Sequence, residues 1–366
     1  MKNMRKIGYA ALAAVWMALV VFSWFGPARD ISEAERRPLA QMPAISPETV
    51  LNGKFMEEFE DYSLDQFPLR DTFRKIKSLF HYNALMQKDN NGIYIADGFA
   101  VKQEYPLNEA SVNHALERFN HIYDTHLADS GSRVVFAVVP DKGYYLAERS
   151  GHLSLDYGAL MEKTEAALPW AEHVDLTGSL EGADYYRTDT HWRQENLHDA
   201  AQILCDALGA TPFLREELTR EKIERPFYGV YYGQAALPME PEDMFILRSQ
   251  VLDGCTVYDH ETGKTGAVYD MTKLESRDLY DVFLSGARAM LTIENPGVAS
   301  DRELIVFRDS FGSAMIPLLL KDYATVTVID IRYISSDLLG NFLDFHGQDV
   351  LMLYSTLVLN SSNSLK

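Results

Sequence analysis

The carboxyl-terminal part of the chain alternates short apolar runs with amphipathic segments. β-Branched apolar runs stand at ELIVF, TVTVID and DVLMLYS, and the segments between them, SFGSAMIPLLLKDY and SSDLLGNFLDF, have the spacing of helices. An earlier run of the same kind, RVVFAVVP, follows a long amphipathic segment at about 107–127. Strands that alternate with helices predict a mostly parallel sheet covered by helices on both faces. We therefore expect an α/β fold.

The stretch at about 210–295 interrupts this alternation. It is rich in tyrosine and glycine, with short runs such as PFYGVYYG and TVYDHETGKTGAVYD, in which ETG at 261–263 has the composition of a hairpin turn. We predict a β-rich insertion here. Nearer the amino terminus, Asp97-Gly98 between two apolar runs predicts another hairpin.

A basic start followed by an uncharged run marks the amino terminus. Lys2, Arg5 and Lys6 precede the uncharged run Ile7–Gly26. This run is long enough for a helix to cross a ~30 Å hydrocarbon core. From the positive-inside rule we expect the amino terminus to stay in the cytoplasm and the rest of the chain to be exported. A buried core helix fits the basic flank poorly. A cleaved signal peptide is the closer alternative, but no small-x-small site follows the run, so we favour a retained, single-pass membrane anchor.

The predicted domain organisation follows from these segments. Residues 1–27 form the membrane anchor or signal segment, and residues 28–50, charged and proline-containing, form a tether. Residues 51–366 form the catalytic domain with its insertion. From Asn52 two helical segments are expected, and Pro68 in DQFPLR ends the first because its ring cannot continue the hydrogen-bond ladder.

Charge and cysteine content exclude several classes of function. A formal net charge of −19 argues against nucleic-acid binding, since neutralising phosphates requires clustered lysine and arginine, and we find no such cluster beyond the first six residues. Cys205 and Cys255 are too few for a disulfide scaffold, and their spacing fits no zinc motif. We predict two buried thiols, with a single bridge as the alternative.

Two positions carry the parts of an activated nucleophile. In LIVFRDSFG a strand ends and Ser310 stands at or near the start of a helix, where oriented N–H groups suit an oxyanion. In YRTDTHW, Asp189 and His191 are two residues apart, so in an extended segment their side chains point the same way and the carboxylate can fix the imidazole tautomer. Serine, histidine and aspartate together form a catalytic triad.

Each of these signals alone has a plainer explanation. A serine after an aspartate at a helix start is commonly a cap, and an isolated Asp-x-His is commonly structural. A metal site would need further ligands, and His198 on the following helix is the one candidate in reach, without an obvious set to complete it. We predict no metal.

The motifs resemble those of the DHHW family of exported bacterial proteins. The resemblance rests on YRTDTHW and RDSFG, with DQFPLR, NGIYIADG and VVPDKGYY upstream, and covers nearly the whole chain after the anchor. That family is related to the alginate O-acetyltransferases and through them to the SGNH hydrolases. It implies an SGNH-like three-layer sandwich with a permuted motif order, in which Asp-x-His precedes the serine.

The resemblance also implies roles for individual residues. Ser310 matches the nucleophile and contributes its N–H to the oxyanion hole, His191 matches the general base, and Asp189 matches the residue that orients it. Lys142 and Gly143 match a second loop that faces the pocket. Thr190 replaces the histidine that the family name implies, and we expect its side chain to point away from the pocket.

Further candidates for substrate binding lie around these positions. Arg308 replaces the usual glycine and puts a cation near the mouth, where it either holds an anionic or hydroxyl-rich substrate or pairs with Asp309. Trp192 either stacks on a sugar ring or orders the loop. The others are pocket-lining or simply structural: Tyr186, Arg187, Arg332 and Tyr333.

The function implied is a membrane-tethered, extracytoplasmic serine O-acyltransferase that acetylates a cell-envelope polysaccharide or exopolysaccharide through an acyl-Ser310 intermediate. The resemblance further implies a membrane-bound O-acyltransferase as partner and acyl donor, and no cofactor. An acetyl esterase would use the same triad. A polysaccharide-binding or scaffold protein, with the tyrosine-rich insertion as its contact surface, is the alternative outside the enzymes.

Overall fold

The chain divides into two compact units. The computed structural model describes residues 2–32 and 34–366. Unit 1 comprises Met1–Asn91 with Tyr232–Met239, and unit 2 comprises Gly92–Tyr231 with Glu240–Lys366. The domain boundaries that we derived from the sequence stay predictions.

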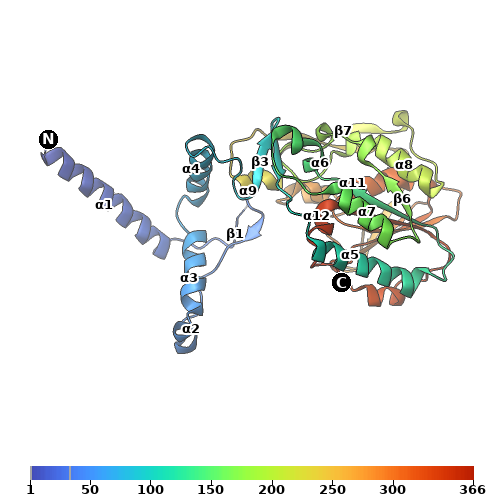
Figure 1. Cartoon of the computed structure of the whole chain (residues 1–366), viewed down its shortest axis with the longest axis horizontal. Coiled ribbons are helices and arrows are strands. Elements are labelled where there is room, and N and C mark those ends of the chain that lie inside the picture. The colour runs from blue at the N-terminus through green and yellow to red at the C-terminus, as the bar shows by residue number, and fades with distance from the viewer. Residues whose placement is uncertain (1, 33) are drawn as a thin grey trace. The chain divides into compact units, whose positions relative to one another are not determined.

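Unit 1 is built mainly from helices (Figure 1). Its elements are α1 (Lys2–Phe25), β1 (Ile31–Ser32), β2 (Arg37–Pro38), α2 (Pro47–Leu51), α3 (Lys54–Asp65), α4 (Arg70–Asn83) and most of α9 (Val230–Ala235). Within α1, Arg5–Ser23 is long and apolar enough to cross a membrane. A signal sequence meets the same criterion, so the expected apolar helix is present while its topology stays a prediction.

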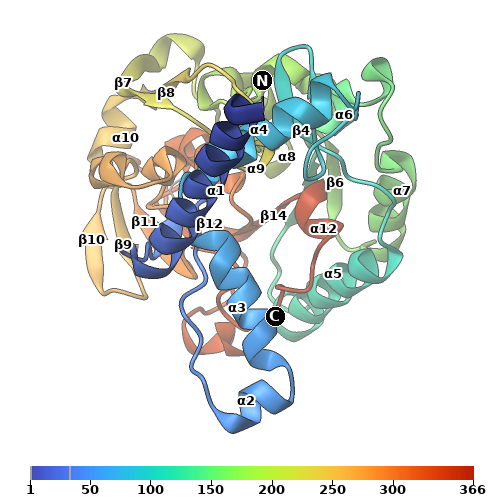
Figure 2. The same ribbon diagram turned by 90° about the vertical axis from the view of Figure 1, so that its left-hand side faces the viewer.

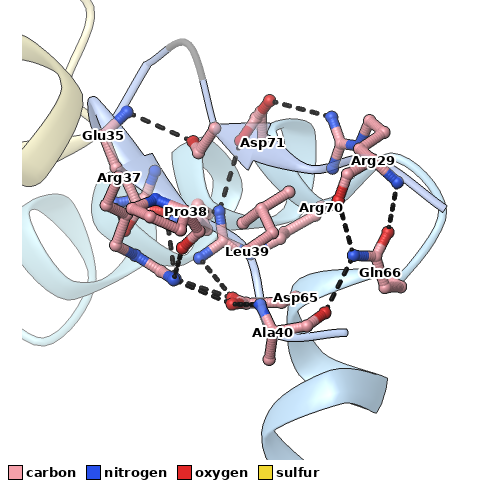
Figure 3. Close-up of polar contacts among 12 residues, drawn as sticks. Arg29, Glu35, Arg37, Pro38, Leu39, Ala40, Asp65, Gln66, Arg70 and Asp71 are labelled. Atoms are coloured by element: carbon pink, nitrogen blue, oxygen red, sulfur yellow. Dashed lines mark hydrogen bonds and ion pairs between the residues drawn. The ribbon is translucent and has the colours of Figure 1, made fainter. Parts of the chain in front are cut away.

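The break between α3 and α4 falls where DQFPLR predicts it. Asp65 is the last residue of α3, and Leu69, at φ 59°, turns the chain so that α4 begins at Arg70. Figure 3 shows how the break is held. Arg37 donates two hydrogen bonds to the Asp65 carboxylate, at 2.8 and 2.6 Å, the Ala40 amide donates a third at 2.9 Å, and Arg70 lies 3.2 Å away. The carboxylate therefore joins the segment around β2 to both helices.

Unit 2 is organised around an eight-stranded sheet. In spatial order its strands are β10 (Lys264–Gly266), β9 (Thr256–Asp259), β11 (Met290–Glu294), β13 (Thr325–Ile329), β12 (Glu303–Arg308), β14 (Asp349–Ser355), β5 (Val134–Val139) and β6 (Glu172–Asp175). The strands from β13 to β6 are parallel, and β11, β9 and β10 continue the sheet antiparallel. In Figure 2, β9 and β10 lie at one edge and β6 at the other. The predicted mostly parallel sheet is confirmed.

Helices cover both faces of this sheet, as expected. The helices of unit 2 are α5 (Glu109–Ile122), α6 (Lys142–Leu146), α7 (Tyr157–Ala167), α8 (His198–Leu208), α10 (Gln250–Gly254), α11 (Gly312–Met315) and α12 (Thr356–Leu359). Successive strand residues point to opposite faces. In β5, Val134, Phe136 and Val138 pack in the core with α5 and α7, while Val135 and Val139 pack in the core with α8. Unit 2 is thus a three-layer sandwich.

Two separate hairpins complete unit 2. They are β3 (Ile93–Ala96) with β4 (Phe99–Lys102), and β7 (Thr219–Phe227) with β8 (Glu242–Arg248). The first is the hairpin predicted at Asp97-Gly98, where both residues have positive φ, 50° and 84°. The second lies in the segment predicted to be β-rich, whose later strands β9–β11 extend the main sheet.

Three local predictions differ from the structure. The run VYYG was expected in a strand but forms α9. The helix expected from Ser310 to Tyr323 is α only in α11 and continues as a 3₁₀ helix, Ile316–Asp322. The helix expected at SSDLLGNFLDF is a 3₁₀ helix, Ser336–Asn341. Cys205 and Cys255 are free and buried, as predicted, so no bridge joins them.

Replacing Asp65 by asparagine should loosen unit 1 in a pH-dependent way. The hydrogen bonds from Arg37 hold the pKa of this buried carboxyl below its usual 3.8. Its contribution to stability is therefore full above pH 3.8 and is lost as the pH falls further. Because Arg37 is half-exposed, we expect a cost of about 1–2 kcal/mol at neutral pH. Hydrogen exchange at the Ala40 amide would report it, and a difference between wild type and variant that persists at pH 2 would contradict this account.

Candidate active site

Two loops of unit 2 carry the residues that the sequence singles out. Asp189 and His191 lie in the loop between β6 and α8, and Ser310 lies between β12 and α11. The first loop is a tight hairpin, in which Tyr185 bridges to Trp192 and the Tyr186 amide donates to the His191 carbonyl. Its tip is bent and not extended, and the Asp189 carboxylate accepts a hydrogen bond from the His191 amide at 3.0 Å. This turn, not strand alternation, brings both side chains to one side.

The three side chains form one continuous hydrogen-bonded row. The His191 Nδ1 atom lies 2.6 Å from Asp189 Oδ1, and its Nε2 atom lies 2.8 Å from Ser310 Oγ. A carboxylate beside Nδ1 places the ring proton there, so that Nε2 accepts the serine hydroxyl. Asp189 is completely buried, His191 is 7% exposed and Ser310 is partly exposed. The row therefore runs from the interior toward solvent, and its serine oxygen is the outermost reactive atom.

A segment 40 residues further along the chain fixes the far side of Asp189. The Val230 amide donates to Asp189 Oδ2 at 2.8 Å, and the Gly229 amide donates to Thr188 Oγ1 at 2.9 Å. A Cβ atom at Gly229 would lie 2.3 Å from the Asp189 Cα atom, closer than any side chain tolerates. Glycine is therefore required here for the close approach of the two backbones. Nothing in the sequence pattern signals this contact.

A second buried carboxylate holds the backbone before Asp189. Glu242, at the start of β8, accepts the amides of Arg187 and Thr188, each at 2.8 Å, and the Thr188 hydroxyl at 2.9 Å. Its side chain is 1% exposed and also lies 3.6 Å from Arg193. Because an ionised acid needs such donors when buried, Glu242 and the hairpin stabilise each other. Sequence reasoning missed this residue.

Aromatic rings pack around the imidazole. Tyr280 stacks on His191 with ring centroids 3.9 Å apart and planes 7° from parallel, and Phe311 packs against it at 5.0 Å. Trp192 is completely buried and donates from Nε1 to the Phe311 carbonyl at 3.0 Å. It thus ties the histidine loop to the serine loop. Of the two roles open to Trp192, the structure supports ordering of the loop, because no face of the ring reaches solvent.

Asp309 shapes the turn that presents Ser310. Its buried carboxylate accepts the Phe311 amide at 2.9 Å and the Ser355 amide, at the end of β14, at 2.7 Å. Among the residues that the structure describes, the Ser310 amide has no acceptor. It is available to an oxyanion that forms beside Ser310 Oγ.

The second predicted loop turns its polar groups inward. Lys142 is 2% exposed and donates from Nζ to the carbonyls of Ala100 and Tyr186, at 2.5 and 2.9 Å, and burial lowers its pKa to about 7. The Gly143 amide donates to Asp141 Oδ1 at 2.6 Å. The expectation that these groups face the pocket is therefore wrong, since both are engaged inside the protein.

Tyr186 and Thr190 lie in the loop that carries Asp189 and His191. Tyr186 is completely buried against Phe227 and Tyr280, so it is a packing residue. Thr190 is partly buried and accepts a hydrogen bond from the Tyr231 hydroxyl at 3.0 Å. It takes no part in the hydrogen-bonded row of Asp189, His191 and Ser310.

The predicted cations do not converge on Ser310. Arg308 was expected near the mouth, but it is completely buried, donates to the Gly286 carbonyl at 3.1 Å and lies 3.7 Å from Asp330. Burial lowers the pKa of its guanidinium, and Asp330 opposes that effect. Arg332 makes a two-pronged hydrogen bond to the same Asp330, at 2.9 and 2.6 Å. The buried Asp330 carboxylate therefore pairs with both arginines inside the protein, which is a structural role. Arg308 is not placed to meet substrate.

Two of the predicted residues remain at the surface. The side chain of Arg187 is 46% exposed, with Glu242 3.5 Å away, and Tyr333 is 49% exposed. Their part in substrate binding stays a prediction. Within residues 2–32 and 34–366 no group of three or more metal-ligating side chains gathers.

The sequence matches two protein families. Residues 178–329 match the family described as DHHW protein, and residues 93–239 match the SGNH hydrolase-like domain of the acetyltransferase AlgX. Both matches contain Asp189 and His191, and the first also contains Ser310. A comparison with curated proteins found no match.

Solved structures resemble the fold. A DHHW family protein from Eubacterium siraeum is 22% identical, with a TM-score of 0.61 over 75% of this chain and 94% of its own. PatB1 from Bacillus cereus is 15% identical, with a TM-score of 0.55 over 73% of this chain and 96% of its own. At these identities the likeness concerns the fold. With the family matches, it confirms the resemblance seen in the motifs: residues 178–329 are similar to DHHW proteins, residues 93–239 are similar to the SGNH hydrolase-like domain of an acetyltransferase, and the fold is SGNH hydrolase-like.

Proposed function

We propose that this protein is a membrane-tethered, extracytoplasmic serine O-acyltransferase that acetylates hydroxyls of a cell-envelope polysaccharide or exopolysaccharide. The observation that carries the proposal is the row Ser310–His191–Asp189, with its two short hydrogen bonds and an outward serine. The match of residues 93–239 to an acetyltransferase domain supports acyl transfer as the reaction class.

In the first half-reaction Ser310 Oγ attacks the carbonyl carbon of an acyl donor. His191 Nε2 takes the hydroxyl proton, and the Asp189 carboxylate stabilises the imidazolium that forms. The free Ser310 amide faces the developing oxyanion. Collapse of the tetrahedral intermediate, with the proton passed from His191 to the leaving group, gives an ester on Ser310.

In the second half-reaction a sugar hydroxyl attacks that ester. His191 Nε2 removes the hydroxyl proton, the new ester bond forms, and the proton returns to Ser310 Oγ. Water in place of the sugar would make the same protein an esterase. The choice therefore depends on the acceptor that reaches Ser310, not on the three side chains.

The acyl donor follows from the proposed location. If α1 retains the protein at the membrane with unit 2 outside, cytoplasmic acetyl-CoA does not reach Ser310. We propose that a membrane-bound O-acyltransferase hands the acyl group across and that the acceptor is a polysaccharide. The apolar span Arg5–Ser23 supports the tethering.

Removing either reacting side chain should abolish turnover of a chromogenic acetyl ester. Ser310→Ala and His191→Ala should each lower kcat by roughly 10³-fold or more, because the nucleophile and base act as one unit. The exposed Ser361→Ala serves as the matched control and should keep full activity. Unchanged turnover in both site variants would falsify the triad. A wild type that binds glycan without any turnover would favour a binding protein.

Gly229→Ala should reduce kcat while leaving the three reacting side chains in place. The added methyl would push the Gly229–Val230 backbone off Asp189 and disturb the hydrogen bonds that aim His191. We expect a loss of roughly tenfold to 100-fold, typical of a misplaced catalytic group. Gly254→Ala is the matched control, because its added carbon meets nothing within 4 Å. Equal activity of the two variants would contradict this role of Gly229.

Transfer and hydrolysis can be separated by adding acceptors. With a chromogenic acetyl ester as donor, a panel of soluble neutral and anionic oligosaccharides should include one that becomes acetylated, with the product identified by mass spectrometry. Ser310→Ala should form none of it. Release of acetate alone, at a rate that no oligosaccharide changes, would instead identify an esterase.

A further inference from the structure

Helix α4 in unit 1 is amphipathic with its apolar side outward. Leu69, at its N-cap, and Phe73, Ile76 and Phe80 follow the spacing of one helix face. They are 67%, 44%, 56% and 55% exposed, respectively. Four large apolar side chains in a row on a surface mark a contact site.

The opposite side of α4 is polar and buried. Ser78 is completely buried and donates to the Ala235 carbonyl at 2.9 Å, and Asn90 donates to the same carbonyl at 2.8 Å and to Ser78 Oγ at 2.7 Å. Arg74 donates to the Gly233 carbonyl at 2.9 Å. These hydrogen bonds fix the rotation of the helix. The apolar face therefore cannot turn inward without breaking them.

The same helix is locally basic in an acidic protein. Its sequence has four cations, Arg70, Arg74, Lys75 and Lys77, against one acid, Asp71, whereas the whole chain carries −19. The expectation of no basic cluster beyond the first six residues is therefore wrong for α4. Lys75 and Lys77 are both exposed. Lys75 lies over the Tyr232 ring, 5.9 Å from its centroid, whereas Lys77 makes no ion pair or hydrogen bond within residues 2–32 and 34–366.

A cavity of ≈ 730 Å³ adjoins the apolar face. Its wall combines the rings of Phe67 and Phe73 and the side chain of Leu64 with the cations of Arg74 and Lys77. An occupant that satisfies this wall has an apolar part and an anionic part side by side. Arg70 and Glu35 also line the cavity, and Glu35 pairs with both Arg70 at 2.5 Å and Arg74 at 3.2 Å. Of the lining cations in the described part of the chain, this leaves Lys77 to meet the anion.

We propose that the outward face of α4 lies in the interfacial layer of a bilayer rich in anionic lipid, with a lipid headgroup beside Lys77. An amphipathic helix with lysines at the border of its apolar face binds such a surface by burying that face among the acyl chains. A membrane span earlier in the same unit, Arg5–Ser23, would keep α4 near the bilayer surface. The inference rests on the proposed membrane anchoring and is independent of acyl transfer.

Charge favours lipid over a protein as the occupant. A protein partner of an apolar helix face usually covers it with apolar contacts. Here Lys77 lies beside the apolar face, so a suitable occupant has an anion at the edge of an apolar phase. The headgroups of anionic lipids already lie at the edge of the apolar acyl chains. The proposal commits to lipid, and a membrane protein in its place is an outcome of the test.

The full-length protein with Ile76→Cys, labelled with an environment-sensitive fluorophore, tests this contact. Leu153→Cys is the matched control, since Leu153 in unit 2 is 55% exposed against 56% for Ile76. Cys205 and Cys255 are buried, and burial raises their pKa values to about 12 and about 11, so the native thiols give little labelling. In vesicles of phosphatidylcholine with phosphatidylglycerol, we expect a blue shift and quenching by brominated lipid at position 76 only.

Two further results decide the proposal. Lys77→Gln in the labelled protein should lower the membrane-docked fraction at low salt, by roughly fivefold in its equilibrium constant. A label at position 76 that stays as water-exposed as the label at position 153, in vesicles where flotation verifies insertion of α1, would overturn the contact. Shielding that appears in native membranes but not in protein-free vesicles would also overturn it and assign the face to a membrane protein.

Discussion

The candidate site depends on one buried negative charge. The Asp189 carboxylate accepts hydrogen bonds from the His191 amide, the His191 ring and the Val230 amide. A buried carboxylate is tolerable only when its oxygens are satisfied in this way. The same bonds therefore serve two purposes, because they keep an ionised acid in the interior and they set the direction of the imidazole. The buried Glu242 carboxylate likewise accepts the amides of Arg187 and Thr188, just before Asp189. Two buried acids therefore hold a loop that has little regular structure of its own.

The three residues of the candidate site could be predicted from the sequence, whereas the residues that support them could not. Strand-and-helix periodicity put Ser310 after a parallel strand, and the spacing of Asp189 and His191 suggested a pair, so their proximity could be anticipated. Gly229 and Glu242 are 40 and 53 residues from Asp189 and belong to no periodic pattern. Contacts of this kind arise from tertiary packing, and an unaligned sequence contains no local trace of them.

Tertiary context overrides the preference of single residue types at several positions. The tyrosines and valine of VYYG favour strands in isolation, yet this run forms α9. Arg308 was expected near the mouth of the site because it replaces the usual glycine, but it is buried, where it donates a hydrogen bond to the Gly286 carbonyl and lies close to the Asp330 carboxylate. Gly312 makes room for it, since a Cβ atom at that position would lie 2.7 Å from the Arg308 Cβ. In α4 the exposed side is the apolar one, contrary to the usual rule for a soluble helix.

The order in which the site is assembled follows from its long-range bonds. Asp189 and His191 lie at the middle of the chain, and Val230 follows. Ser310 comes 119 residues after His191, and the Ser355 amide that steadies the serine turn lies 46 residues beyond Asp309. During synthesis from the amino terminus, His191 therefore has no Ser310 beside it until most of the chain exists. A chain that stops before Ser310 would therefore hold the histidine but no serine beside it. The topology thus makes the proposed reactivity depend on a nearly complete chain.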